Sequence, residues 1–263
     1  TAGFEASDAL PRLVSIKAGT KVNVVPGKAK AAVEGFEMVA LEKAAAETKE
    51  ETGISFELAA EGTVTEITAT GIGAHASTPD VGNNALTGLL VFLGKLDFAS
   101  CPQVDMVRKT ASLFPHGDVN GKTLGVAMED ELSGNLTLSF NMLTVDAASM
   151  DGEFDGRIPV CGNDENVLEV VRARMAEQGL TLLNKALIPP HHVSADSYFV
   201  KTLLAAFELY TGRKGECQAL GGGTYVHHLE NGVAFGAAMP ETDNKMHGPD
   251  EFAVVDELLV SAK

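Results

Sequence analysis

The stretch that decides the fold is residues 54–77, ISFELAAEGTVTEITATGIGAHAS. Its two apolar segments meet at Glu61 and Gly62, a pair typical of a tight turn. The stretch therefore predicts two strands joined by a turn, followed by a loop of glycines and small residues around His75. Loops with glycine and proline at fixed places bring backbone and side chains close to other groups, so the environment of His75 is the main functional question.

Helices are expected on both sides of this stretch. Residues 35–53 are rich in Ala, Glu and Lys, and Gly53 is expected to end that helix. A second helix is expected over residues 82–96, directly after the His75 loop. Residues 10–35 predict short strands in series, so strands and helices alternate along the first part of the chain.

The middle of the chain predicts more of the same elements. Residues 102–114 predict a helix, and residues 122–160 predict strands. The alternating pattern in that second segment, with a turn at Ser133 and Gly134, favours an antiparallel sheet. Residues 163–179 form the clearest helix pattern, with Asn163 or Asp164 as the N-cap and Gly179 as the end.

The character of the sequence changes after residue 188. A strand is expected over residues 180–188, and Pro189-Pro190 is the best linker signal in the chain. Beyond it, a helix is expected over 197–212, a strand over 232–239 and a last helix near the end. We therefore expect a domain boundary near residue 188.

Composition excludes several classes of partner. The 263-residue chain has a formal net charge of −16, which argues against binding to nucleic acid or to an anionic membrane. No apolar run approaches the roughly 20 residues that a membrane helix needs. We expect no signal peptide, and the start at Thr1 rather than Met suggests a processed or partial sequence. Its three cysteines form no metal-binding spacing, and we expect them to be reduced, buried thiols in a cytoplasmic protein.

Four places could carry chemistry, and on spacing alone each keeps a structural alternative. His75 could donate to a developing oxyanion or could be a polar surface residue. The glycines of GGGTY, residues 221–225, could bind an anion through backbone N–H groups or could form a tight turn. Arg157 could grip a carboxylate or could pair with nearby Glu153 or Asp155. His247 could bind zinc or could lie at an ordinary helix entry.

Taken in order, these motifs carry a resemblance. The series NVVP, GIGAHASTPDVGNNA, DGRIPV, GGGTY and MHGPDEF closely resembles the zinc metallopeptidases of the M20 family, and within them the PepV-like dipeptidases. The resemblance covers nearly the whole chain. It implies an α+β fold in which residues 1–188 form a lid domain, an antiparallel sheet with helices on one face built from β-α-β units. Residues 189–263 would be the C-terminal, α/β segment of the catalytic domain.

The resemblance also implies roles for particular residues. His75 would stabilise the tetrahedral oxyanion together with zinc. Asn23, Arg157 and the backbone of Gly222 and Gly223 would hold the C-terminal carboxylate of a small peptide substrate. The last zinc ligand would be His247.

One region of the family pattern is missing from this chain. Family members carry a His-x-Asp motif, a bridging Asp, a Glu-Glu pair and a further Asp before the lid, and none of these has a counterpart in context here. His116-Gly117-Asp118 and Glu50-Glu51 mimic two of these motifs, but their positions between lid elements favour structural roles. The adjacent pairs His191-His192 and His227-His228 are assigned no metal, because neighbouring side chains point apart.

The resemblance thus implies a zinc-dependent dipeptidase that works together with an N-terminal catalytic part absent from this chain. Two zinc ions are expected in the complete enzyme and few or none in this chain, which we expect to be inactive alone. PepV-like enzymes are expected to act as monomers, whereas other M20 lids dimerise through a sheet edge, so self-association is also open. The alternative is a non-catalytic binding or assembly module built on the same lid.

Overall fold

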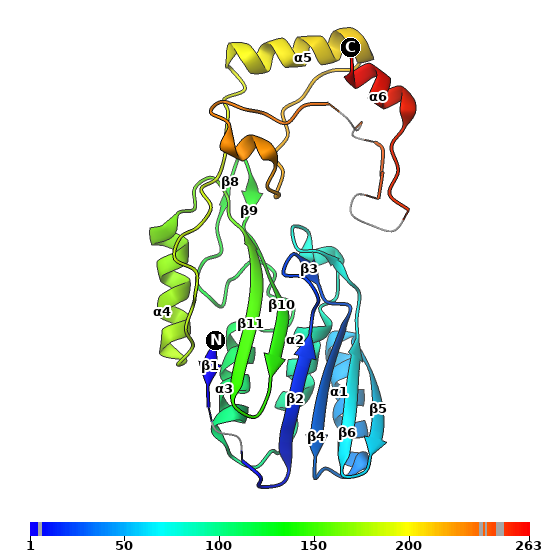
Figure 1. Ribbon diagram of the computed structural model, residues 1–263, viewed down its shortest axis with the longest axis vertical. Helices are drawn as coiled ribbons and strands as arrows, with labels where there is room; N and C mark the ends of the chain where they lie inside the picture. Colours follow the sequence, from blue (N-terminus) through cyan, green and yellow to red (C-terminus); the bar gives the residue numbers. More distant parts are fainter. Residues whose placement is uncertain (5–6, 237–238, 240, 246–249) are drawn as a thin grey trace. The chain divides into compact units, whose positions relative to one another are not determined.

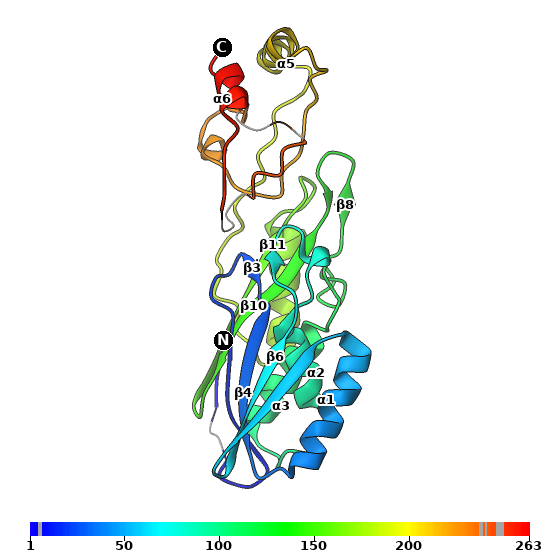
Figure 2. The same cartoon turned by 90° about the vertical axis from the view of Figure 1, so that its right-hand side faces the viewer.

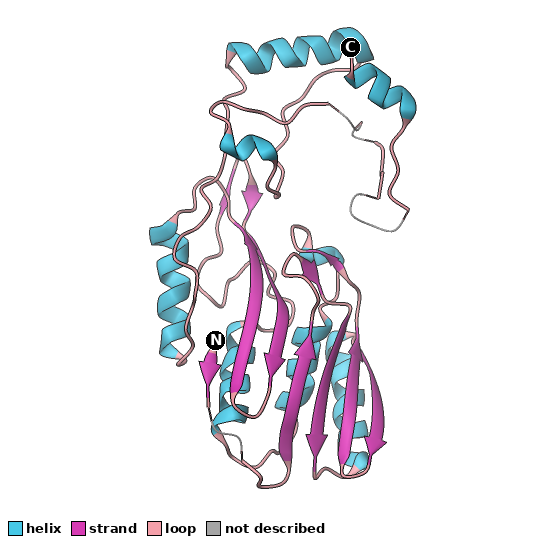
Figure 3. Ribbon diagram, viewed as in Figure 1, coloured by secondary structure: helices cyan, strands magenta, loops and turns pink. Residues whose placement is uncertain are grey.

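The computed structural model describes residues 1–4, 7–236, 239, 241–245 and 250–263. Within them the chain is an α+β protein with a mostly antiparallel arrangement of strands and six α-helices. It divides into two units, residues 1–189 and 190–263. Figure 3 shows that the strands gather in the first of these units.

The first unit is built on a seven-stranded sheet in the order β1-β11-β10-β2-β4-β6-β5 (Figure 1), and every neighbouring pair is antiparallel. The strands are β1 (Ala2–Gly3), β2 (Arg12–Ala18), β4 (Lys28–Glu34), β5 (Ser55–Glu61), β6 (Val64–Thr70), β10 (Thr137–Val145) and β11 (Ser149–Arg157). The turn predicted at Glu61 and Gly62 joins β5 and β6, in which Glu61 pairs with Val64. The stretch that opens the sequence analysis therefore forms one edge of the sheet.

Helices cover one face of this sheet, as Figure 2 shows for α1 (Met38–Thr52), α2 (Ala85–Gly94) and α3 (Pro102–Leu113). Their apolar side chains meet those of the strands in one core, which includes Leu41 of α1, Phe92 of α2, Ile67 of β6 and Leu143 of β10. Each large apolar side chain buried in this way contributes about 1.5–3 kcal/mol. The prediction of an antiparallel sheet with helices on one face is confirmed.

Helix ends in this unit follow the sequence signals. Gly53 adopts a left-handed conformation (φ 74°) after α1, and its N–H donates to the carbonyl of Lys49, as expected for a helix stop. Asn163 caps the helical segment formed by a π-helical turn (Asp164–Leu168) and α4 (Glu169–Glu177). Its side chain accepts from the N–H groups of Glu165 and Asn166.

Two short antiparallel pairs lie outside the main sheet. One joins β3 (Val24–Val25) to β7 (Ala74–His75), and the other joins β8 (Glu129–Asp130) to β9 (Gly134–Asn135). A single turn of 3₁₀-helix, Pro79–Val81, follows β7 and leads into α2. The first pair carries the residue singled out by the sequence, His75, away from the regular strands.

The strand expected over residues 180–188 does not form. Leu180 is buried and Leu182 and Leu187 pack against the core, but the backbone finds other partners. The N–H of Thr181 donates to the carbonyl of Thr1, and the N–H of Leu187 donates to Asp164. Leu180, Leu182 and Leu187 therefore pack on the core, but no neighbouring strand forms hydrogen bonds with the backbone of this segment.

Residues 190–263 contain α5 (Tyr198–Thr211), a 3₁₀ turn (Tyr225–His228) and α6 (Val255–Ser261). The strand expected over 232–239 is not formed over its described residues 232–236, and the described part of this unit contains no strand. The described residues of this unit are therefore helical or irregular, because a strand exists only where a neighbour pairs with its backbone.

Two further sequence expectations can be compared with the structure. All three cysteines are free thiols, but only Cys101 is buried, whereas Cys161 and Cys217 are exposed. The expectation of buried thiols was therefore wrong for two of them. None of the helices in the described ranges combines the length and apolar character required to span a lipid bilayer.

Candidate functional site

His75 and Asn23 are brought together by the β3–β7 ribbon. Val24 pairs with His75 and Val25 pairs with Ala74 in antiparallel register. One residue beyond the ribbon, the N–H of Ala76 donates to the carbonyl of Asn23 at 3.0 Å. Two candidates that lie about fifty residues apart in the sequence are therefore held side by side by backbone hydrogen bonds.

The imidazole of His75 is exposed and is held by Ser77. The Nδ1 atom accepts the backbone N–H of Ser77 at 3.2 Å and lies 2.7 Å from the Ser77 hydroxyl oxygen. A backbone N–H can only donate, so Nδ1 must be the unprotonated nitrogen of the ring. The neutral ring therefore carries its proton on Nε2, and the described residues provide no hydrogen-bond partner for this N–H.

A buried polar pair on β10 supports the chain just before Asn23. The side chain of Asn141 is fully buried and donates from Nδ2 to the carbonyl of Val22 at 2.6 Å. Its Oδ1 accepts the hydroxyl of Ser139 at 2.5 Å. Since a buried amide is costly unless it is hydrogen-bonded, both bonds fix the path of the chain that leads into β3.

Asn141 lies at a β-bulge. In the pairing of β10 with β11, Phe140 faces Phe154 and Met142 faces Glu153, so Asn141 is an extra residue without its own partner. Gly19 closely approaches this point, because a Cβ added to it would lie 2.0 Å from the carbonyl oxygen of Asn141. Bulges redirect side chains and often lie beside functional sites. Here the side chain of the bulged residue, Asn141, donates to the carbonyl of Val22 and so supports the β3–β7 ribbon.

Arg157 is the last residue of β11 and is engaged by Asp155. The guanidinium donates from Nε to Oδ1 at 2.5 Å and from Nη2 to Oδ2 at 2.7 Å. This is the pairing that the sequence had left open as the structural alternative for Arg157, and it is bidentate. β11 ends and β10 begins at the same end of the sheet where the β3–β7 ribbon lies (Figure 1).

The remaining candidates lie in the second unit. Gly222 and Gly223 precede the turn formed by Tyr225–His228, and a Cβ added to either glycine would meet open space. Their glycine identity is therefore not required by packing. His247 lies outside the described residues, so its role as a zinc ligand stays a prediction.

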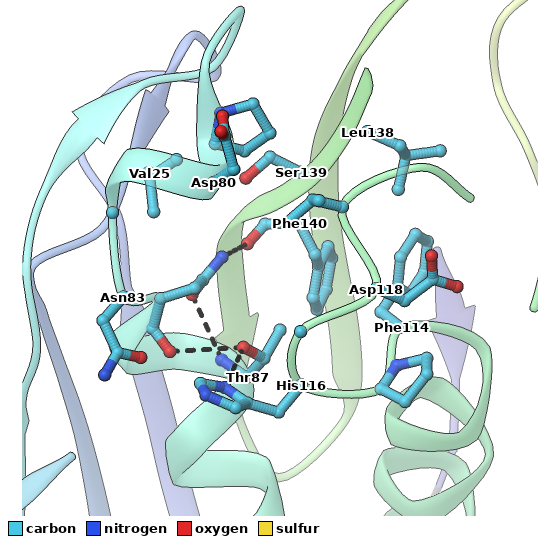
Figure 4. Close-up of a pocket in the computed structure, with 16 residues that line it drawn as sticks. Val25, Asp80, Asn83, Thr87, Phe114, His116, Asp118, Leu138, Ser139 and Phe140 are labelled. Carbon is cyan, nitrogen blue, oxygen red and sulfur yellow. Dashed lines mark hydrogen bonds between the residues drawn. The ribbon is translucent and has the colours of Figure 1, made fainter. Parts of the chain in front are cut away.

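A cavity of about 260 Å³ lies next to the His75 loop (Figure 4). Its wall includes Val25 of β3, Asp80 of the 3₁₀ turn, and the stacked rings of Phe114 and Phe140. Several polar groups that line the cavity already form hydrogen bonds within the fold. Asn84 caps α2 and donates to the carbonyl of Phe140 at 2.8 Å, so this part of the wall supports the fold.

His116 and Asp118, which mimic a metal-binding motif, also line this cavity and act structurally. His116 Nδ1 lies 2.9 Å from the Thr87 hydroxyl oxygen, and burial lowers the pKa of its imidazole, which favours the neutral ring. Burial opposes ionisation of Asp118, but the backbone N–H groups of Thr123 and Lys122 outweigh it and hold the pKa of that carboxyl below its ordinary value. The carboxylate of Asp118 therefore stabilises the turn of residues 118–123 by accepting these backbone hydrogen bonds.

Metal ligands do not cluster in the described part of the chain. Within those residues, no three or more His, Cys, Asp or Glu side chains gather in a way that could hold a metal ion. Two imidazoles do approach each other, since the ring centroids of His191 and His227 lie 5.4 Å apart. The sequence analysis missed this pair because it considered only adjacent histidines. His191 Nε2 is already paired with the carbonyl oxygen of Gly232 at 2.6 Å.

Comparison with known proteins gives relatives that are named as dipeptidases. The chain is 35% identical over 257 residues to a protein of Bacillus subtilis (strain 168) named "Putative dipeptidase YtjP". It is 34% identical over 254 residues to the "Beta-Ala-Xaa dipeptidase" of Lactobacillus delbrueckii subsp. lactis. Both alignments cover 95% of this chain. No protein-family model matches the chain.

These alignments cover only part of each relative. The matched region is 53% of either protein, so the chain spans about half the length of the curated relatives it matches. The chain is thus related in sequence, along nearly all of its length, to proteins named as dipeptidases.

Proposed function

We propose that the chain belongs to a zinc-dependent dipeptidase that hydrolyses dipeptides with a free C-terminal carboxylate. In this proposal residues 1–188 are the lid and residues 189–263 are a segment of the catalytic domain. The observation that carries the proposal is the β3–β7 ribbon, which holds His75 beside Asn23, while the Nε2–H of the imidazole has no partner among the described residues. Sequence similarity to proteins named as dipeptidases supports the same reaction class.

His75 would act on the oxyanion that forms when water adds to the scissile carbonyl. Its Nε2–H is a neutral donor that can approach an oxygen atom, while Ser77 holds the opposite side of the ring. A donor that is oriented before the reaction stabilises developing charge without having to reorganise. The role of His75 is thus to bind the tetrahedral intermediate more tightly than the substrate.

Substrate binding would come from Asn23, Arg157 and the backbone of Gly222 and Gly223. A guanidinium recognises a carboxylate through two parallel N–H bonds, which suits the C-terminus of a dipeptide. Because that grip exists in the ground state as well as in the transition state, loss of Arg157 should raise KM with little change in kcat.

Zinc belongs to the proposal only at the level of the complete enzyme. The described residues of this chain do not offer a metal-binding cluster, and they therefore do not fit a zinc centre by themselves. The proposal assigns His247 as one ligand and the other ligands to the part of the enzyme outside this chain. When bound, zinc would polarise the scissile carbonyl and activate water.

The experiment that tests this function compares the 263-residue chain with the protein made from the complete reading frame around it. Both are incubated with zinc and assayed on a series of dipeptides and on the same dipeptides with an amidated C-terminus. We expect hydrolysis only by the complete protein, with the amides as poor substrates. Zinc near two ions per 263-residue chain, together with hydrolysis by that chain, would contradict the assignment of the missing ligands. Failure of the zinc-loaded complete protein to cleave any dipeptide would favour the non-catalytic module.

A further inference from the structure

Asp155 and Arg157 form a bidentate pair at the end of β11. The two residues are separated by one position and so lie on the same side of the strand. Asp155 is the more deeply buried of the two, with 12% of its side chain exposed compared with 24% for Arg157. The ion pair is therefore a partly buried, fixed arrangement and differs from the exposed pairs that contribute little.

The pair uses only one side of the guanidinium. Asp155 accepts from Nε and Nη2, and the described residues provide no hydrogen-bond partner for Nη1. A planar guanidinium presents a second edge, formed by Nη1 and the remaining N–H of Nη2, with the same spacing of donors. A second carboxylate can therefore bind at this outer edge without displacing Asp155.

The neighbouring strand adds an unused polar group at the same place. Thr137 lies directly opposite Arg157 in the register of β10 and β11, and Ser139 lies opposite Asp155. Directly opposed side chains lie about 4.5–5.5 Å apart at their Cβ atoms. The hydroxyl of Thr137 is buried and has no hydrogen-bond partner among the described residues. The surroundings of Arg157 thus hold more hydrogen-bonding capacity than these residues use.

We infer that Asp155 is a positioning residue that orients Arg157 for a substrate carboxylate, leaving the Nη1–Nη2 edge of the guanidinium as the binding edge. This inference rests on the proposed function and adds to it the group that makes Arg157 selective. An arginine held in place loses less conformational freedom on binding, and its two outer donors match a planar carboxylate. Because the charges of Arg157 and Asp155 cancel, the pair does not attract anions by net positive charge, and a ligand must match the two N–H donors to bind.

The opposite role for Asp155 predicts the opposite result. If Asp155 blocked Arg157 as an internal competitor, its removal would free the cation and tighten the binding of a carboxylate. If Asp155 orients Arg157, its removal lets the side chain swing and weakens binding. Asp155→Asn separates the two, because the amide nitrogen would face the Nη2 donor and break the bidentate contact while the size of the side chain is kept.

The kinetic experiment uses the complete protein, the dipeptide it hydrolyses fastest and the C-terminal amide of that dipeptide. For Asp155→Asn we expect KM for the free dipeptide to rise about tenfold, in line with the loss of a hydrogen bond to a charged group. We expect kcat to change little and the preference for acid over amide to fall. The control is Asp151→Asn, the same charge change at an exposed position on the same strand, and KM should stay within about twofold.

Arg157→Ala separates failure of this inference from failure of the proposed function. A raised KM in Arg157→Ala with an unchanged or lowered KM in Asp155→Asn would overturn the positioning role alone. Unchanged KM in both variants would remove the carboxylate grip from the proposed function as well. If the complete protein hydrolyses no dipeptide, the geometry is tested by NMR on the 263-residue chain. The Nε–H of Arg157 should be protected from solvent exchange in the parent and lose protection in Asp155→Ala, which removes both acceptor oxygens, and an unprotected parent signal would overturn the inference.

Discussion

The two units of the chain use apolar residues in different ways. Residues 1–189 bury them between a seven-stranded sheet and its helices, with Leu41, Ile67 and Phe92 completely inaccessible. Among the described residues of 190–263, Val200 is the one apolar side chain that is buried, and Tyr198 and Leu259 are largely exposed. Apolar content therefore does not create a core by itself, since a core needs a second layer that faces the first.

The strongest test of this comparison is hydrogen exchange of the native chain. We expect amides in β4 and β10 to exchange only through global unfolding, whereas amides in α5 and α6 should exchange through local opening of small free energy. Mass spectrometry of peptides after a time series in deuterated buffer measures both regions in one sample. Equal protection in the two units would show that burial in the structure misrepresents their stability.

The next largest effect should come from truncating matched leucines in the two units. Leu41→Ala removes a fully buried side chain from α1 and should lower the free energy of unfolding of the first unit by about 2–5 kcal/mol. Leu259→Ala, at a position that is 58% exposed in α6, should change the free energy of unfolding of the second unit by no more than about 0.5 kcal/mol. Urea titrations followed by circular dichroism give both values, and a similar shift in the two variants would erase the contrast.

A third test asks whether the well-packed unit also carries the chemistry. In the complete protein, His75→Ala should reduce kcat by about 10²–10³, or roughly 2.7–4 kcal/mol, with a smaller effect on KM. Val81→Ala, an exposed position in the turn after the same loop, is the matched control and should leave kcat unchanged. Steady-state kinetics with zinc content checked decides the matter, and kcat within about threefold of the parent in His75→Ala would make this loop a surface turn.

The smallest effect concerns the hairpin β8–β9. Asp130 accepts backbone N–H bonds from Ser133 and, across the chain, from Cys161, and these bonds lower the pKa of its carboxyl to about 2. In the unfolded chain the pKa of an Asp carboxyl is about 3.9. The charged carboxylate of Asp130 therefore stabilises the fold above that pH, and this contribution is lost as the pH falls toward 2.

The corresponding variant is Asp130→Asn. Urea midpoints of the parent should decline between about pH 4 and pH 2 more steeply than those of Asp130→Asn, because the amide does not titrate. Glu131→Gln is the control, since it changes the neighbouring charge without touching these hydrogen bonds. Parallel pH curves for the parent and Asp130→Asn would contradict the role of this carboxylate.

Local signals predicted much of the first unit. The turn at Glu61 and Gly62, the stop at Gly53 and the cap at Asn163 depend on short-range chemistry, and each is formed as expected. The strand expected over 180–188, and the described part of the one expected over 232–239, do not form because a ladder depends on a partner elsewhere in the chain. An apolar pattern does not record what the backbone of a segment will bond to.

The candidate site was harder to predict than the fold. The motif around His75 identified that residue, but only the three-dimensional structure brings Asn23 beside it. The hydrogen bonds that link Ser139 to Asn141 and Asn141 to Val22 could not be predicted from the sequence. Polar residues in a strand are ordinarily expected to face solvent, whereas these two are buried. Asp155 was noted as a neighbour of Arg157, while its use of a single edge of the guanidinium depends on side-chain geometry.

The bulge at Asn141 has a consequence for insertions and deletions. Phe140 and Leu143 are both buried although three positions separate them, so the strand changes its alternation between these two residues. Removing Asn141 would place them two positions apart and leave a regular strand, with each apolar side chain still on its present face. A chain shortened by this one residue should therefore keep its sheet and lose the tether to Val22. Gaps in related sequences at this position would then identify relatives whose β3–β7 ribbon is held in another way.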